Sequence, residues 1–200
     1  MSSQAVRETL VARTIEVIAT EGLDKTTTKA IVDGTGINEA YIYRHFSSKD
    51  DLLANAFTKL DNELAEKMLQ YVEVMYVQDL DYETRCRAFF VSVWKFLLSD
   101  KQRCVTFVRY YYSPYFLKYS MVDHVKRYAP LIKKFEDAFI EEADIWMILN
   151  HILNVMLDFA IKVHSGLMPN EDIYAEHVFR VLYASVKQYF KRAKENDYKL

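Results

Sequence analysis

The chain has 200 residues, of which 51% are hydrophobic and 27% are charged, and its formal net charge is −2 at neutral pH. This length suits one large domain or two small ones, and the apolar share is enough for a sizeable core. With 4 glycines and 3 prolines the chain lacks the turns of a β-sandwich or barrel, and its 15 tyrosines and 12 phenylalanines exclude a disordered polymer. The net charge excludes a globally basic nucleic-acid binder but leaves room for a local basic face.

Several features bear on the compartment of the protein. Cys86 and Cys104 form neither a disulfide framework nor a zinc-binding spacing, which suits a reducing cytosol. The first residues do not have the pattern of a signal peptide. The most apolar stretch, residues 145–163, carries polar side chains such as Asn150 and Asp158, which are not typical of a membrane span. We therefore expect a soluble, cytoplasmic, all-α protein with about nine helices and no cofactor.

The first three helices are expected to be separated by glycines. The first covers residues 3–21 and has a glycine just past its end. A threonine triplet at 26–28 caps the second, which stops at Gly34-Thr35-Gly36. Asn38 then caps a third helix over residues 39–45.

Longer helices are expected behind them, because glycine and proline become rare. The fourth helix is predicted at about 53–75, behind a capping pattern at Ser47-Ser48, and the fifth runs from Asp79 or Asp81 to Leu97. Residues 101–120 are expected to be helical with a break at Pro114, and Pro130 starts or kinks the next helix. The last two helices are predicted at 144–165 and behind a cap at Asn170, and the final one ends in Lys191, Arg192 and Lys194.

Two short helices joined by a glycine-containing turn are typical of a helix-turn-helix, whose second helix enters the DNA major groove. The same pattern also suits a plain three-helix packing unit. Residues 38–45 favour DNA binding, because a buried helix of this length could not satisfy so many hydrogen-bonding side chains. These side chains belong to Asn38, Glu39, Tyr41, Tyr43 and His45.

A recognisable pattern runs through residues 7–60: a first helix ending in glycine, a Thr-Thr step, a glycine turn and a Tyr-x-His-Phe-x-x-Lys segment. Its residues are Gly22, Thr27, Thr28, Ile31, Gly36, Ile37, Tyr43, His45, Phe46, Lys49, Leu52 and Leu53. With this pattern the segment resembles the N-terminal domain of the TetR family of bacterial transcriptional regulators. The resemblance implies a helix-turn-helix domain over residues 1–47 and a helical ligand-binding and dimerisation domain over 48–200.

The resemblance also implies which residues touch DNA. Contacts with phosphates are implied for Thr28, Tyr43, His45 and Lys49, contacts with bases or the adjoining backbone for Lys29, Asn38, Glu39, Ala40 and Tyr41, and Thr27 completes the set. Glu39 departs from the family pattern, since an acid there repels phosphate. It either accepts a hydrogen bond from a cytosine amine or only serves the helix dipole, and both interpretations are open. Gly34 stands where alanine is usual and is expected to weaken the second helix by roughly 1 kcal/mol.

A homodimer held by the last two helices of each chain is a further implication of the resemblance. The stretch 145–163 is apolar nearly all round and must be covered on two sides, either by a second subunit or by its own chain. The candidate interface residues are Ile152, Val155, Phe159, Val163, Val178, Leu182, Val186 and Tyr189.

The resemblance implies a small-molecule pocket in the second domain, which is rich in aromatic residues. The candidate lining residues are Phe90, Trp94, Phe107, Tyr111, Tyr115, Trp146, Asn150 and Asn154, although ordinary core packing would use the same residue types. Asn150, His151, Asn154 and Asp158 share one helix face and could meet either the ligand or the dimer seam.

These features together predict a ligand-responsive transcriptional regulator, most often a repressor, that binds palindromic double-stranded DNA as a homodimer and is released by a small, largely apolar effector. No catalytic or metal-binding motif is found, so we do not expect an enzyme. Two alternatives stay open: a helical enzyme or carrier that uses the aromatic pocket, and a regulator that is released by a protein partner.

Overall fold

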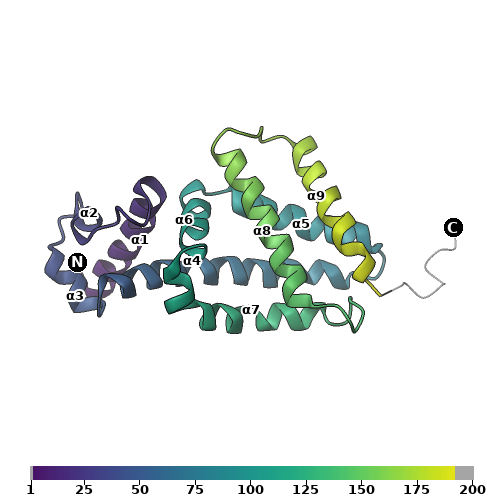
Figure 1. Cartoon of the computed structure of the whole chain (residues 1–200), viewed down its shortest axis with the longest axis horizontal. Helices are drawn as coiled ribbons and strands as arrows, with labels where there is room; N and C mark the ends of the chain where they lie inside the picture. Colours follow the sequence, from purple (N-terminus) through teal and green to yellow (C-terminus); the bar gives the residue numbers. More distant parts are fainter. Residues whose placement is uncertain (1, 192–200) are drawn as a thin grey trace. The chain divides into compact units, whose positions relative to one another are not determined.

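The computed structural model describes residues 2–191, which contain nine α-helices and no β-strand (Figure 1). An isolated antiparallel bridge between Phe139 and Phe190 is the only β-type pairing in this range. The predicted all-α class and the number of helices are therefore confirmed.

The elements follow one another with few interruptions. In chain order they are α1 (Ser3–Glu21), α2 (Thr28–Val32), the 3₁₀ turn η1 (Glu39–Tyr41), α3 (Ile42–His45), α4 (Lys49–Tyr71), the 3₁₀ turn η2 (Val72–Tyr76), α5 (Tyr82–Leu98), α6 (Lys101–Tyr111), the π-helical turn η3 (Phe116–Ser120), α7 (Met121–Phe135), α8 (Ile145–His164), α9 (Asp172–Val186) and the 3₁₀ turn η4 (Lys187–Tyr189).

The chain divides into two compact units. Unit 1 comprises Met1–Lys67 and Lys95–Tyr128, and unit 2 comprises Met68–Trp94 and Ala129–Leu200. The boundary between them falls inside α4, α5 and α7. The functional division expected after residue 47 is a different boundary, and it stays a prediction.

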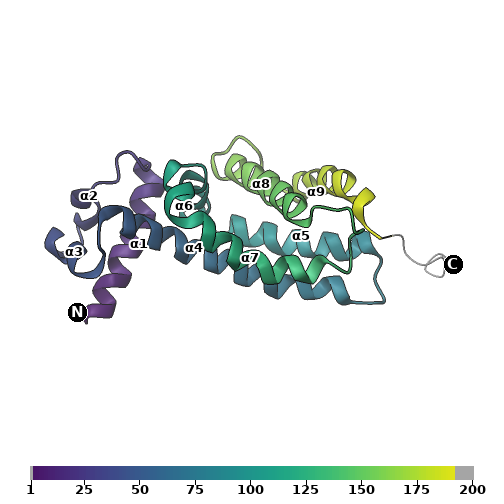
Figure 2. The same cartoon turned by 60° about the horizontal axis from the view of Figure 1, so that its bottom comes forward.

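In unit 1, α1 and α6 lie side by side (Figures 1 and 2). The buried hydroxyl of Thr106 donates to the carbonyl of Ile15 at 2.7 Å, and the guanidinium of Arg109 donates to the carbonyl of Ile18 at 2.6 Å. Arg109 also donates to the carbonyl of Ala19 at 3.1 Å, which is one of the last carbonyls of α1 and has no partner within the helix. The largest fully buried apolar side chains of unit 1 include Leu10, Ile18, Ile31, Ile42, Leu52, Leu53 and Phe57.

In unit 2, α8 and α9 lie side by side in both views (Figures 1 and 2). By length and composition α8 could cross a membrane. One face of α8 is buried inside unit 2, and exposed His151 and Asp158 lie outside that face. The buried residues of α8 are Ile148, Leu149, Leu153, Met156, Leu157 and Ala160.

The predicted boundaries are accurate where capping residues mark them. The side chain of Ser2 accepts from the amide of Ala5 at the start of α1, and the predicted range of that helix is confirmed. The side chain of Thr27 accepts from the amide of Ala30, and that of Asp81 accepts from the amide of Thr84. Each bond satisfies an amide that would otherwise lack a partner at a helix start.

Other expectations about the elements were wrong. Glu171 occupies the cap position of α9, without a side-chain bond, instead of Asn170. The helix ends at Val186, so Lys191 lies beyond it, and Arg192 and Lys194 lie outside the described residues. Residues 39–45 form a 3₁₀ turn followed by a short α-helix instead of one helix. Pro130 lies inside α7, which excludes a helix start at this proline and leaves the expected kink as a prediction.

Candidate nucleic-acid interface

The turn between α2 and η1 depends on two glycines. Gly34 and Gly36 both have φ of +71°, a left-handed conformation that side chains with a Cβ disfavour. Since α2 ends at Val32, Gly34 lies outside the helix and does not weaken it, which corrects the expectation from the sequence. Glycine at position 34 instead permits the turn.

Residues 38–45 present a polar surface because their apolar side chains point the other way. Ile42 is fully buried, while the side chains of Tyr41 and Tyr43 are 40% and 60% exposed. Asn38 caps the segment, since its side-chain oxygen accepts from the amide of Ala40 at 2.9 Å. His45 is half-buried. The segment therefore offers solvent the tyrosines and polar groups that were predicted to meet DNA.

Thr28 and Glu39 are joined across the turn. The hydroxyl of Thr28, at the start of α2, donates to a carboxylate oxygen of Glu39 at 2.7 Å. Glu39 is exposed and so is the neighbouring Lys29. Thr27 is exposed as well, but its hydroxyl is used to cap α2. The structure thus joins two residues of the predicted DNA-binding set that come from α2 and η1.

Lys49 is the first residue of α4, where free backbone amides and the helix dipole favour an anion. The start of α4 is fixed by a capping box: the Ser48 hydroxyl accepts from the amide of Asp51, and the Asp51 carboxylate accepts from the amide of Ser47. The hydroxyl of Tyr119, in η3, donates to the carboxylate of Asp50 at 2.9 Å. These bonds hold Lys49 in place within unit 1.

Arg44 is a residue of this surface that the sequence reasoning did not include. It is exposed, and its guanidinium lies 4.6 Å from the centre of the Tyr41 ring. The spacing of three residues within one helical segment was the available signal, because side chains at that spacing share a face. A guanidinium held on an aromatic ring is suited to a phosphate or a guanine edge.

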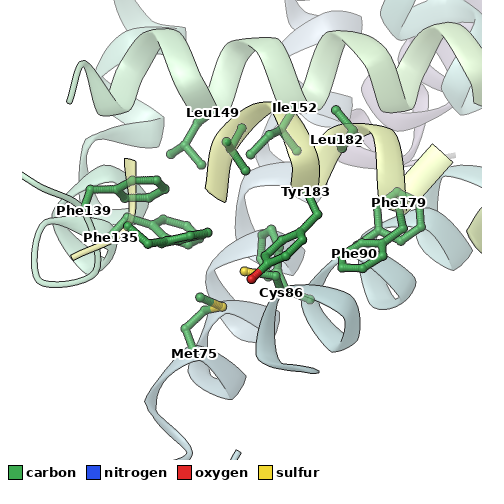
Figure 3. Close-up of a pocket in the computed structure, with 13 residues that line it drawn as sticks. Met75, Cys86, Phe90, Phe135, Phe139, Leu149, Ile152, Phe179, Leu182 and Tyr183 are labelled. Atoms are coloured by element: carbon green, nitrogen blue, oxygen red, sulfur yellow. The ribbon is translucent and has the colours of Figure 1, made fainter. Parts of the chain in front are cut away.

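Unit 2 contains an apolar cavity of about 50 Å³. Figure 3 shows Tyr183 of α9 reaching between Phe135 and Phe90, with Cys86 and Met75 beyond its ring. Burial raises the pKa of the Cys86 thiol to about 12, so this wall group is uncharged at neutral pH. The lining residues are Met75, Cys86, Phe89, Phe90, Phe135, Phe139, Leu149, Ile152, Phe179, Leu182, Tyr183, Val186 and Phe190.

The cavity is not lined by the set of ligand residues that the sequence suggested. Phe90 lines it, and Trp94 stacks on Phe90 with ring centres 5.7 Å apart. Phe107 instead lines a cavity of about 10 Å³ in unit 1 and stacks on Tyr111. Of the others, Tyr115 belongs to unit 1, and Trp146, Asn150 and Asn154 are half-buried on α8. Their contact with a ligand stays a prediction.

Several residues expected at a dimer interface are buried within the single chain. Val178, Leu182 and Val186 are buried, and Leu182 and Val186 line the cavity together with half-buried Ile152. The other predicted interface residues, Val155, Phe159, Val163 and Tyr189, are half-buried. The exposed residues on α8 and α9 include Met147, His151, Asp158, Ile173, His177, Val181 and Ala184, which we call the outer α8–α9 face.

The four polar residues of α8 have different surroundings. Nε2 of His151 lies 3.2 Å from the Ser185 hydroxyl, and Asp158 pairs with Lys162. The side-chain amide of Asn150 donates to a backbone carbonyl one turn earlier. The side-chain oxygen of Asn154 is buried and has no hydrogen-bond partner among the described residues.

Known proteins resemble this chain in sequence at one end and in fold over most of its length. Residues 10–56 match the family described as "Bacterial regulatory proteins, tetR family". The fold is similar to that of a TetR family transcription regulator from Marinobacter aquaeolei VT8, with a TM-score of 0.75 and 14% identity over 94% of this chain and 97% of that chain.

Two further solved structures have a similar fold. A putative TetR family transcription regulator from Shewanella sp. PV-4 has a TM-score of 0.70 and 14% identity over 96% of this chain and 100% of that chain. The fatty acid degradation regulator FadR from Bacillus halodurans has a TM-score of 0.68 and 17% identity over 88% and 93%. No curated protein matches the sequence.

Proposed function

Because residues 10–56 are a TetR-family helix-turn-helix DNA-binding domain and the described chain has the fold of that family's transcription regulators, we propose that this protein is a cytoplasmic repressor. It binds a palindromic DNA operator as a homodimer and is released by a small, largely apolar ligand. One observation carries the proposal: residues 38–45 bury Ile42 yet leave Tyr41 and Tyr43 exposed. A segment that only packed would not keep these rings in water.

The residues around this segment divide into two roles. Tyr43, His45 and Lys49 contact phosphates, which fix the position of the protein on the duplex. Lys29, Asn38, Glu39, Ala40 and Tyr41 face the base edges or the adjoining backbone in the major groove. Arg44, held on the Tyr41 ring, adds a positive charge to a surface that also carries the acid Glu39.

The homodimer forms through the outer α8–α9 face. Val181, 67% exposed, and Met147, 55% exposed, are apolar residues on that face. A twofold dimer matches a palindromic operator, whose half-sites lie roughly 34–36 Å apart.

The effector binds in the apolar cavity of unit 2. Its walls hold no ionised side chain, and the volume of about 50 Å³ is small compared with the roughly 300–1,000 Å³ of ordinary ligand pockets. An effector must therefore widen the cavity and so favours a different arrangement of its walls. The cavity also supports a small ligand over release by a protein partner.

The widened cavity acts on the DNA-binding segment through α4. Met75, which lines the cavity, lies in η2, and η2 continues directly from α4, whose first residue is Lys49. A shift of Met75 is therefore passed along a continuous helical segment to a residue proposed to hold phosphate. In a dimer this changes the spacing of the two recognition segments, and they no longer fit successive major grooves.

The test is selection of DNA from a random pool by the full-length protein, followed by release. We expect a palindromic consensus, and we expect naphthalene, but not naphthalene-2-sulfonate, to release that DNA and change the fluorescence of Trp94 and Trp146. A double variant, Tyr43→Ala with Lys49→Ala, should lose binding while keeping its helical circular-dichroism spectrum. Failure of the wild-type protein to select any DNA would overturn the proposal.

A further inference from the structure

The bond between Thr28 and Glu39 gives the exposed acid a defined orientation. The two residues are eleven positions apart and lie in different elements, α2 and η1. Thr28 is half-buried and Glu39 is exposed, so the bond ties a surface carboxylate to a fixed backbone. An unsupported surface glutamate would have several free rotamers, and this one is restrained before any DNA arrives.

The bond also bears on the two interpretations of Glu39 that the sequence left open. An acid in the first turn interacts favourably with the helix dipole and can also bond to free backbone amides there. At this start, however, the side chain of Asn38 already accepts from the amide of Ala40. The hydrogen bond recorded for the Glu39 side chain is with Thr28. Glu39 lies in the first turn of η1, but its side chain bonds to Thr28 and not to the amides of that turn, which favours the base-reading interpretation.

A carboxylate accepts hydrogen bonds and repels other acceptors, which limits the bases that Glu39 can face. In the major groove the donors are the N4 amine of cytosine and the N6 amine of adenine. The adenine amine is flanked by N7 of its own ring and by O4 of the paired thymine, both acceptors. The cytosine amine has the O6 of guanine on one side and only a C5–H on the other. Cytosine is therefore the best partner.

We propose that Glu39 reads one cytosine in each operator half-site through its N4 amine, and that Thr28 is the positioning residue for this contact. Thr28 has a single hydroxyl proton, which it donates to Glu39. While that bond holds, Thr28 cannot also donate to a phosphate, so its part in recognition is to orient the acid. The inference rests on the proposed DNA-binding function and adds the base that the site selects.

The first arm of the test compares DNA selected by full-length wild-type protein and by three variants, Glu39→Gln, Thr28→Val and Thr28→Ser. The wild type should select cytosine at one symmetric position. Glu39→Gln should change that position to adenine, because an amide can pair with both N6 and N7. Thr28→Val should weaken the preference, whereas Thr28→Ser should keep it, since serine restores the donor. A purely structural role for Thr28 would not alter the base preference.

The second arm removes a single group from the DNA. In a probe with 2-pyrimidinone in place of the selected cytosine, the N4 amine is missing. We expect the wild type to lose roughly 10-fold to 100-fold in affinity for this probe. Glu39→Gln should bind both probes almost equally.

The outcomes separate the inference from the proposed function. If the wild type and Glu39→Gln select the same consensus, or if removal of the amine costs the wild type nothing, the reading of cytosine is wrong while DNA binding stands. If the wild type selects no DNA, both proposals fail.

Discussion

Nδ1 of His124 lies 2.9 Å and 3.0 Å from the two carboxylate oxygens of Asp61 in the interior of unit 1. Asp61 is fully buried and His124 is 2% exposed. Arg127, one turn beyond His124 on α7, pairs with the same carboxylate. Through these contacts the buried carboxylate of Asp61 on α4 holds two side chains of α7. We therefore expect the cluster to contribute to the free energy of unfolding.

Replacing Asp61 by asparagine should lower the free energy of unfolding by roughly 3–5 kcal/mol, because it leaves the Arg127 charge without its buried partner. Urea unfolding at fixed protein concentration measures this. The control is Glu66→Gln, an exposed acid on the same helix, which should change stability by less than about 0.5 kcal/mol. Equal stability of the two variants would contradict the assignment.

Lys49→Ala should weaken binding to all DNA sequences alike and reduce the slope of log affinity against log salt by about 1, because one phosphate contact is lost. Titrations at several salt concentrations measure the slope. Lys126→Ala, an exposed lysine on α7, is the matched control and should leave the slope unchanged. An altered base preference with an unchanged slope would show that Lys49 does not contact phosphate.

The dimer is best tested at Val181, which is 67% exposed on the outer α8–α9 face. Val181→Glu should convert the dimer to a folded monomer, because association would bury a charge that has no partner in place of an apolar side chain. Light scattering gives the mass, and Leu167→Glu, at an 81% exposed position outside both helices, is the control. Leu182→Glu is a poor test, since Leu182 is buried within the chain and its replacement would unfold unit 2. A dimer that survives Val181→Glu would exclude this face.

The ion pair between α5 and α9 should make the stability of unit 2 depend on pH. Hydrogen bonds from Arg180 and then Arg87 lower the pKa of Glu176 below its usual value. A lowered pKa stabilises the folded chain above the ordinary carboxyl pKa, and this stabilisation is lost as the pH falls through the folded-state pKa. Glu176→Gln should therefore cost roughly 0.2–1 kcal/mol at pH 7 and nothing in acid. Melting curves of both proteins from pH 3 to pH 7 check this, and a constant difference would count against it.

The thiols should be unreactive in the folded protein. Burial raises the pKa of both Cys86 and Cys104 to about 12, so at pH 8 only about one thiol in ten thousand is ionised. A thiol reagent should label neither cysteine until urea unfolds the chain and should then label both. Rapid labelling of Cys86 in the native protein would mean that the cavity wall opens readily to water.

Local signals made the N-terminal part of the fold predictable. Ser2 and Gly22 mark the two ends of α1, and each acts through a contact within four residues, which a sequence displays directly. The place of Gly34 was predicted wrongly, because the sequence does not distinguish a glycine inside a weak helix from a glycine just beyond the end of the helix.

The interior of unit 2 could not be predicted in the same way. In α9 the neighbours Val181 and Leu182 are both apolar, yet one is exposed and the other buried. Only the packing of α5 and α8 against α9 decides which one turns inward. No pattern in the sequence indicated the bond from Thr28 to Glu39 either, because the conformation of the turn between the two residues sets the distance between their side chains.

The bonds from α6 to α1 have a consequence for the order of events during synthesis. The carbonyl of Ile15 accepts from a hydroxyl 91 residues later in the chain, and the carbonyls of Ile18 and Ala19 accept from Arg109. A ribosome has to make about half of the protein before α1 can complete its contacts. The DNA-binding segment is thus translated first, but its contacts with the rest of unit 1 are completed only after α6 has been made.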